Sequence, residues 1–123
     1  MKKIRYISIF VAALCVISWP LISLAHVHVE KSIPADGASL SQSPQKIDVW
    51  FTGKVNAEWS KIEVTNSDGK RVDLDNPTND KDDKHLSIGL KPLDSGEYSV
   101  KLNVISGDGH RVKGSISFAI HKK

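Results

Sequence analysis

Apolar and polar residues alternate at every second position through most of the chain, and this period constrains the fold more than any other feature. Successive side chains of a β-strand point to opposite faces, so the alternation indicates strands with one buried face. No segment shows the apolar stripe of a helix. About seven short strands separated by turns predict an all-β fold, an antiparallel β-sandwich with Val, Ile, Leu and Phe between its sheets. The strands are expected at residues 27–30, 47–52, 62–65, 71–74, 86–90, 98–105 and 116–120.

Two polar segments between these strands are read as connections. Asn66-Ser67-Asp68-Gly69 consists of turn-forming residues, which favours a hairpin between the strands at 62–65 and 71–74. Residues 76–84 are rich in Asp and Asn but lack the ligand spacing of a calcium loop. They are therefore expected to form a solvated loop without a metal site.

The N-terminus has the three parts of a secretory signal. Basic residues between Lys2 and Arg5 precede an apolar run from residue 7 to 24, and Ser23-Leu24-Ala25 is a small-x-small cleavage site. The alternative is a retained membrane anchor, because the run approaches the length of a short transmembrane helix. Pro20 near the end of the run and the cleavage site favour removal. We expect cleavage after Ala25.

Cleavage divides the chain into a signal peptide, residues 1–25, and one small mature domain, residues 26–123. The whole chain has 17 Lys and Arg against 14 Asp and Glu, but three basic residues leave with the signal. The balanced charge that remains gives no reason to expect a nucleic-acid partner. The lone cysteine, Cys15, also leaves, which excludes disulfides and thiolate ligands. Any metal must be held by nitrogen and oxygen atoms.

Cleavage would make His26 the first residue, so that its α-amine and ring can chelate one metal ion. A second candidate is Asp108-Gly109-His110, where glycines allow a tight turn that could close over the start of the first strand. An amine, two imidazoles and a carboxylate make the tetragonal nitrogen and oxygen set that Cu(II) prefers. The α-amine has a reference pKa of about 7.7 to 8.0, so copper must displace a proton there, and binding should weaken in acid.

His28 has three possible roles. If Val27 and Val29 face the core, His28 points to the same side as His26. It could then be a further ligand, a group that supports the ligands, or a plain surface histidine.

The remaining aromatic and imidazole side chains are expected to be ordinary ones. His85 opens a strand and His121 lies in the charged tail, and both are expected on the surface. Trp50 and Trp59 are expected to be core or surface aromatics without a role at the metal.

Four segments resemble the CopC family of periplasmic copper-resistance proteins, in order along the whole mature chain: residues 26–37, 46–51, 95–100 and 104–118. The resemblance implies an Ig-like Greek-key β-sandwich or barrel that binds Cu(II) through its N-terminal histidine. It also implies a periplasmic carrier or buffer of copper, with a CopD-like inner-membrane protein as partner and no stable membrane insertion after cleavage.

The chain departs from the family pattern at two places. Many relatives hold Cu(I) in a methionine-rich loop, but the only methionine here is Met1, which leaves with the signal. A thioether Cu(I) site is therefore excluded. Many relatives also have a Phe-Ser-Glu run, where this chain reads Phe51-Thr52-Gly53, so no carboxylate is expected at that position.

Three functions are compatible with these residues. The first is a non-enzymatic Cu(II) carrier or buffer using His26, Asp108, His110 and in one reading His28. The second is an oxidative enzyme, because a terminal-histidine chelate resembles the histidine brace of copper-dependent polysaccharide monooxygenases. Small size and an Asp108 ligand, which would occupy the position needed for oxygen, disfavour it. The third is a metal-free adhesion or surface module. We expect the carrier.

Overall fold

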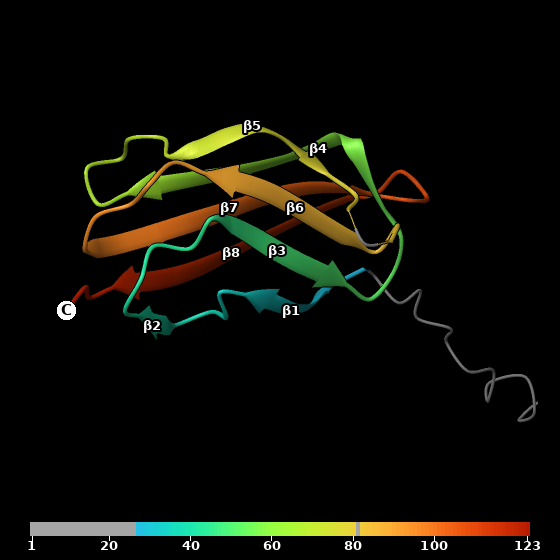
Figure 1. The fold of residues 1–123 in the computed structure, drawn as a ribbon. Coiled ribbons are helices and arrows are strands. Elements are labelled where there is room, and N and C mark those ends of the chain that lie inside the picture. Colours follow the sequence, from blue (N-terminus) through green and yellow to red (C-terminus); the bar gives the residue numbers. More distant parts are fainter. Residues whose placement is uncertain (1–26, 81) are drawn as a thin grey trace, which may run out of the picture.

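The computed structural model describes residues 27–80 and 82–123, which form two β-sheets packed face to face (Figure 1). Residues 1–26, which include the expected signal peptide and His26, lie outside the described residues. The described part contains no helix, and hence none that could cross a bilayer. Its strands are β1 (Val29–Ile33), β2 (Ala38–Leu40), β3 (Lys46–Phe51), β4 (Val55–Asn66), β5 (Asp73–Thr78), β6 (His85–Leu90), β7 (Gly96–Ser106) and β8 (Arg111–Ile120).

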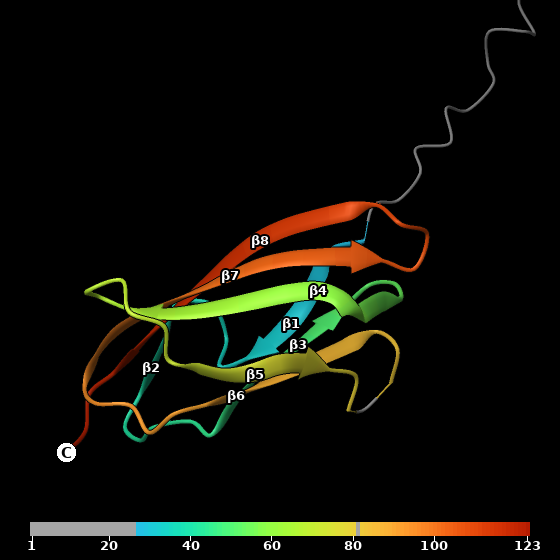
Figure 2. The same cartoon turned by 90° about the horizontal axis from the view of Figure 1, so that it is seen from above.

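Each sheet has four strands, and the view in Figure 2 separates them into two layers. The first sheet has the order β1-β3-β6-β5 and the second has the order β2-β8-β7-β4. Every pairing is antiparallel except that of β2 with β8, which is parallel. The expected Ig-like sandwich is confirmed. The short β2 was not expected, because three residues are too few to show an alternating pattern.

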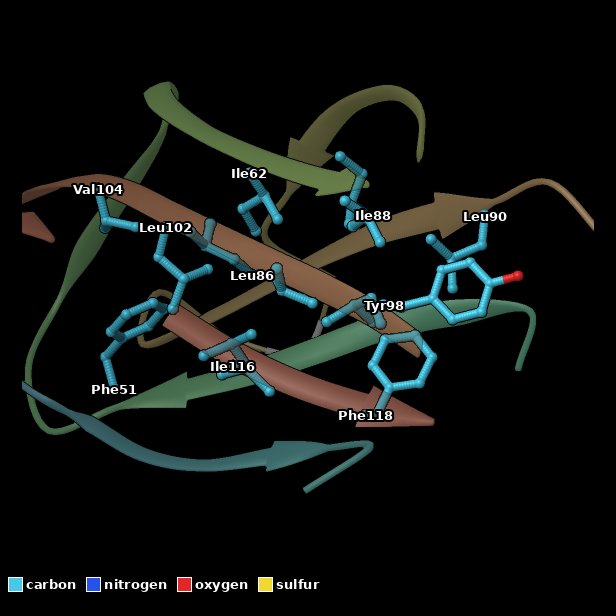
Figure 3. Close-up of a cluster of buried hydrophobic side chains, with 14 of the residues drawn as sticks. Phe51, Ile62, Leu86, Ile88, Leu90, Tyr98, Leu102, Val104, Ile116 and Phe118 are labelled. Atoms are coloured by element: carbon cyan, nitrogen blue, oxygen red, sulfur yellow. The ribbon is translucent and has the colours of Figure 1, made fainter. Parts of the chain in front are cut away.

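The core lies between the sheets and is built from the alternating apolar positions (Figure 3). Val49 of β3 and Val100 of β7 are completely buried, and the rings of Tyr98 and Phe118 stack at 5.3 Å between centroids. Burial of one such aliphatic side chain contributes about 1.5 to 3 kcal/mol, which makes this layer the main source of stability. Alternation therefore predicted the inward faces of β3, β6 and β7 correctly.

The expected hairpin after β4 forms only in part. Its turn is present at residues 66–69, but only Arg71 and Val72 return along β4. From Asp73 onward the chain pairs with β6 in the other sheet. The Asp73 carboxylate accepts a hydrogen bond from the Val64 amide at 2.7 Å and pairs with Arg71 at 2.7 Å. These contacts hold the chain where it crosses between the sheets.

Two further expectations were wrong in detail. The expected loop at residues 76–84 begins inside β5, where Pro77 is buried. In the first strand, Val29 is 37% exposed rather than buried. A register shift between Val29 and Lys31 interrupts the alternation there, and β1 is an edge strand with only β3 beside it.

His85 was expected on the surface and is instead completely buried. It points away from the core, as alternation predicts, but its Nε2 lies 2.7 Å from Asp48 Oδ1 and its ring lies 4.7 Å from that of Trp50. The Asn79 side chain also donates to the His85 carbonyl at 2.8 Å. Bonds from Asn79 and to Asp82 thus tie the segment before β6 to the backbone of His85. His121 is exposed as expected.

Trp50 and Trp59 both lie outside the core. Trp50 is half-buried on the outer face of the first sheet, where Lys31 Nζ lies 4.5 Å from its ring centroid. Trp59 is 68% exposed at an irregularity of β4.

Candidate metal site

The Asp108-Gly109-His110 segment forms the tight turn that connects β7 to β8. The Ser106 amide donates to the His110 carbonyl at 2.8 Å, and the Gly109 amide donates to the Ser106 carbonyl at 2.9 Å. Gly109 has a φ of +90°, a region that side-chain-bearing residues rarely adopt. Glycine is therefore needed there to bring the two polar side chains together.

Asp108 and His110 face each other across this turn. His110 Nδ1 lies 3.0 Å from Asp108 Oδ2, and the Ser106 hydroxyl donates to Asp108 Oδ1. The bond from Ser106, followed by those from the His110 ring and amide, lowers the pKa of Asp108 to about 2. The carboxylate is consequently ionised at neutral pH and offers anionic oxygen to a cation. With Nδ1 toward the carboxylate, His110 directs Nε2 away from it.

His28 lies just before β1 and is held by its backbone. Its amide donates to Thr52 Oγ1 at 2.9 Å, and its carbonyl accepts from the Thr52 amide at 2.8 Å. The same β3–β4 connection holds the turn, since the Gly107 amide donates to the Lys54 carbonyl at 2.7 Å. The start of β1 and the β7–β8 turn therefore share one end of the sandwich, opposite the C-terminus (Figure 1).

The structure brings Asp108 and His110 together but does not add His28 to them. Among residues 27–80 and 82–123, no three side chains of His, Cys, Asp or Glu lie in an arrangement that could hold a metal ion. The expected first ligand, His26, lies outside the described residues. The complete ligand set stays a prediction.

A groove of about 520 Å³ lies beside His28, between β1 and the first half of β8. Its lining includes Val112 near the turn and the apolar side chains of Phe51, Leu102 and Ile116. The surroundings of His28 are thus open on the side of β8.

Gly53 occupies the position where the resemblance to the family implied a carboxylate in other members. A Cβ on Gly53 would lie 2.9 Å from Val27 Cγ2, closer than such atoms approach. Val27 packs against the core at this place. The missing carboxylate therefore coincides with close packing of the segment that leads to His28.

Sequence reasoning missed Ser106. It treated this residue only as the end of a strand, although serine hydroxyls in turns can form hydrogen bonds about two residues further along the chain. That signal in Ser106-Gly107-Asp108 would have found it.

A sequence model of the CopC domain matches residues 29–121, nearly all of the described chain. The chain belongs to the CopC family. This result confirms the resemblance seen in the sequence.

Relatives of this CopC-family chain include proteins named for copper. It is 36% identical over 105 residues to copper transport protein CutJ of Bacillus subtilis, covering 84% of this chain but only 19% of CutJ. It is 34% identical over 107 residues to copper resistance protein C of Xanthomonas campestris pv. juglandis, covering 80% of this chain and 82% of that protein.

Solved structures agree with the fold. The crystal structure of CopC from Methylosinus trichosporium OB3b superimposes with a TM-score of 0.74 at 28% identity, covering 79% of this chain and 95% of that one. PcoC from Escherichia coli, described as a methionine-rich copper resistance protein, shares the fold with a TM-score of 0.69 at 23% identity, covering 79% of this chain and all of PcoC. This CopC-family chain, with a single methionine, is not methionine-rich.

Proposed function

We propose that this chain is an exported copper protein that binds one Cu(II) and carries or buffers it in the periplasm without catalytic turnover. The observation that carries the proposal is the Asp108–His110 pair, held on a fixed turn at the end of the sandwich where β1 starts. Relatives named as copper transport and copper resistance proteins support a role in handling copper rather than in catalysis.

The proposed ligands are the amine and ring of His26, a ring nitrogen of His110 and an oxygen of Asp108. Asp108 is already ionised at neutral pH, so it can ligate without first losing a proton. The imidazole and amine nitrogens match the preference of Cu(II) for tetragonal nitrogen and oxygen sets. His28 is proposed as an additional ligand or as a group beside the site, because its backbone is fixed next to the same connection.

Export is part of the proposal because it creates the site. Removal of residues 1–25 would leave the free amine on His26, two residues before the anchored His28. The copper recipient or donor would be a membrane protein of the CopD type. This partner is proposed from the resemblance to the CopC family, and the relative named copper transport protein CutJ supports a role in copper transport.

The test is a Cu(II) titration of protein that begins at His26, compared with protein that retains Ala25. We expect one tight equivalent and a nitrogen-rich tetragonal electron paramagnetic resonance spectrum from the first. The second should lose most of its affinity because its amine is converted to an amide. Equal affinity in both would refute the terminal chelate.

His110→Ala and His121→Ala form a matched pair for the same titration. Both side chains are exposed, but His121 lies at the opposite end of the sandwich. We expect His110→Ala to weaken Cu(II) binding at least tenfold and His121→Ala to leave it unchanged. Oxygen consumption by the copper-loaded protein with a reductant present should stay at the level of free buffer; turnover would instead indicate an oxidative enzyme.

A further inference from the structure

Ser106, the last residue of β7, has only 3% of its surface exposed. Its backbone already closes the β7–β8 turn through both its amide and its carbonyl, which bond to His110 and Gly109. These two backbone bonds do not involve the side chain and would form with another residue at this position. They therefore give no reason for a serine there.

The hydroxyl bonds to both ends of the proposed ligand pair. It donates to Asp108 Oδ1 and accepts from the His110 amide at 3.2 Å. A hydroxyl has one donor and two acceptor sites, so these two contacts use its donor and one of its acceptors. The same hydroxyl thus ties the Asp108 carboxylate to the backbone of His110.

The proposed ligand side chains lie largely at the surface. The Asp108 and His110 side chains are 69% and 65% exposed, so burial in the core contributes little to their orientation. Within the described part of the chain, the hydrogen bonds to the Asp108 carboxylate come from the turn itself, from Ser106 and His110. Of these two partners only Ser106 is buried, which makes it the rigid support of the carboxylate.

The turn is also tied to the body of the sandwich next to Ser106. The Gly107 amide donates to the Lys54 carbonyl at 2.7 Å. A Cβ on Gly107 would come within 3.1 Å of Lys54 Cβ, so the two backbones lie close together. The base of the turn is therefore held against the β3–β4 connection. The bond from the Ser106 hydroxyl holds the exposed Asp108 carboxylate in place relative to this base.

We propose that Ser106 is a positioning residue of the copper site, whose hydroxyl sets the orientation of Asp108 relative to His110 before the metal arrives. This inference rests on the proposed function, since it assumes that the pair binds copper. Groups that orient metal ligands typically change metal affinity by 10-fold to 100-fold when removed. Loss of this hydroxyl should have an effect of that size.

The experiment compares Ser106→Ala, Ser106→Thr and Ser60→Ala in protein beginning at His26. Ser60 is the matched control because it is 5% exposed and its hydroxyl donates to the Asn56 carbonyl and accepts from the Ile105 amide, one residue from Ser106. It is bonded to the same strand end but contacts neither proposed ligand. Cu(II) affinity is measured by competition with a chelator, together with the electron paramagnetic resonance spectrum and the melting temperature of the metal-free protein.

Ser106→Ala should lose 10-fold to 100-fold in Cu(II) affinity and show an altered or heterogeneous spectrum. Ser106→Thr, which restores a hydroxyl, should recover the spectrum and most of the affinity. Ser60→Ala should lower the melting temperature but keep the affinity and spectrum of the unaltered protein. A spectrum that changes in Ser106→Ala but not in Ser60→Ala would show that the Ser106 hydroxyl orients the ligands. A general loss of stability would change the spectrum in both variants.

Unchanged affinity in Ser106→Ala would overturn the positioning role while leaving the copper-binding function intact. The same conclusion would follow from an equal loss of affinity in Ser60→Ala, or from a failure of Ser106→Thr to recover any affinity. Absence of Cu(II) binding by the unaltered protein would instead refute the proposed function, and the role of Ser106 with it.

Discussion

We expect the buried pair of Asp48 and His85 to make a large contribution to the free energy of unfolding. Asp48 Oδ1 lies 2.7 Å from His85 Nε2, and the two side chains are about 10% and 0% exposed. Lys46 lies 3.9 Å from the other carboxylate oxygen, but its side chain is 45% exposed, so it adds little. Asp48→Ala removes the carboxylate that the buried His85 Nε2 contacts.

The expected cost follows from the burial. Removing one partner of a buried hydrogen bond costs about 1 to 3 kcal/mol, and more where the lost partner is charged, so we take the upper end because Asp48 is a carboxylate and His85 is completely buried. For a domain of this size, 1 kcal/mol corresponds to roughly 4 to 8 °C in melting temperature. Asp48→Ala should therefore melt at least about 12 °C lower than the unaltered protein.

The assay is urea unfolding at pH 7 followed by circular dichroism, with thermal melts in parallel. Glu97→Ala removes an exposed carboxylate from β7 and should change stability by less than about 0.5 kcal/mol. The stability lost in the double variant Asp48→Ala/His85→Leu should be about 2 kcal/mol smaller than the sum of the losses in the two single variants. The two losses are not additive because each residue stabilises the fold through its contact with the other. A loss below 1 kcal/mol in Asp48→Ala, or additive effects in the double variant, would show that the pair is not the stabilising unit described.

Two further predictions concern acid stability and the β7–β8 turn. Burial tends to raise the pKa of Asp73, but hydrogen bonds from Arg71 and the Val64 amide outweigh it and leave that pKa below its usual value. The stability it contributes should be present above about pH 4 and disappear as pH falls further, so urea midpoints of Asp73→Asn should depend less on pH between 5 and 2; parallel curves would contradict this. Gly109→Ala and Gly69→Ala, at φ values of +90° and +81° with open space around an added Cβ, should each cost about 1 kcal/mol in unfolding experiments. Only Gly109→Ala should weaken Cu(II) binding in a chelator competition, and an equal weakening by Gly69→Ala would exclude a specific effect of the turn.

The alternating pattern predicted most of the fold because each strand of a sandwich shows its buried face in its own sequence. Val49 and Val100 were recognisable as inward residues without knowledge of their partners. The pattern did not show which strands pair, and so the residues after Val72 were assigned to a hairpin with β4 although Asp73 leads into the other sheet. Strand pairing depends on contacts such as that of Asp73 with the Val64 amide. The alternation of apolar and polar residues does not show such contacts.

The alternating pattern also could not predict which side chains are buried on the outer face of a sheet. His85 was expected on the surface because it opens a strand directly after a polar loop, and such positions are normally solvated. The His85 ring instead lies against Trp50 and bonds to Asp48, both on the neighbouring strand β3, and the local pattern around His85 does not show these partners. The turn at Asp108 and His110 was accessible to sequence reasoning because its glycines and polar residues are local. The supporting hydroxyl of Ser106 was equally local and was overlooked.

The opposite placement of the proposed metal end and the C-terminus limits how the domain can be tethered. β7 has 11 residues and runs from one end of the sandwich to the other, a span of about 35 Å at roughly 3.3 Å per residue. Anything joined to Lys123 therefore begins about that far from Asp108 and His110 (Figure 1). A flexible linker reaches about 5 to 6 Å times the square root of its length, so roughly 40 residues would be needed to swing an attached domain back to the turn. An affinity tag or surface attachment at Lys123 would accordingly leave the opposite end unobstructed.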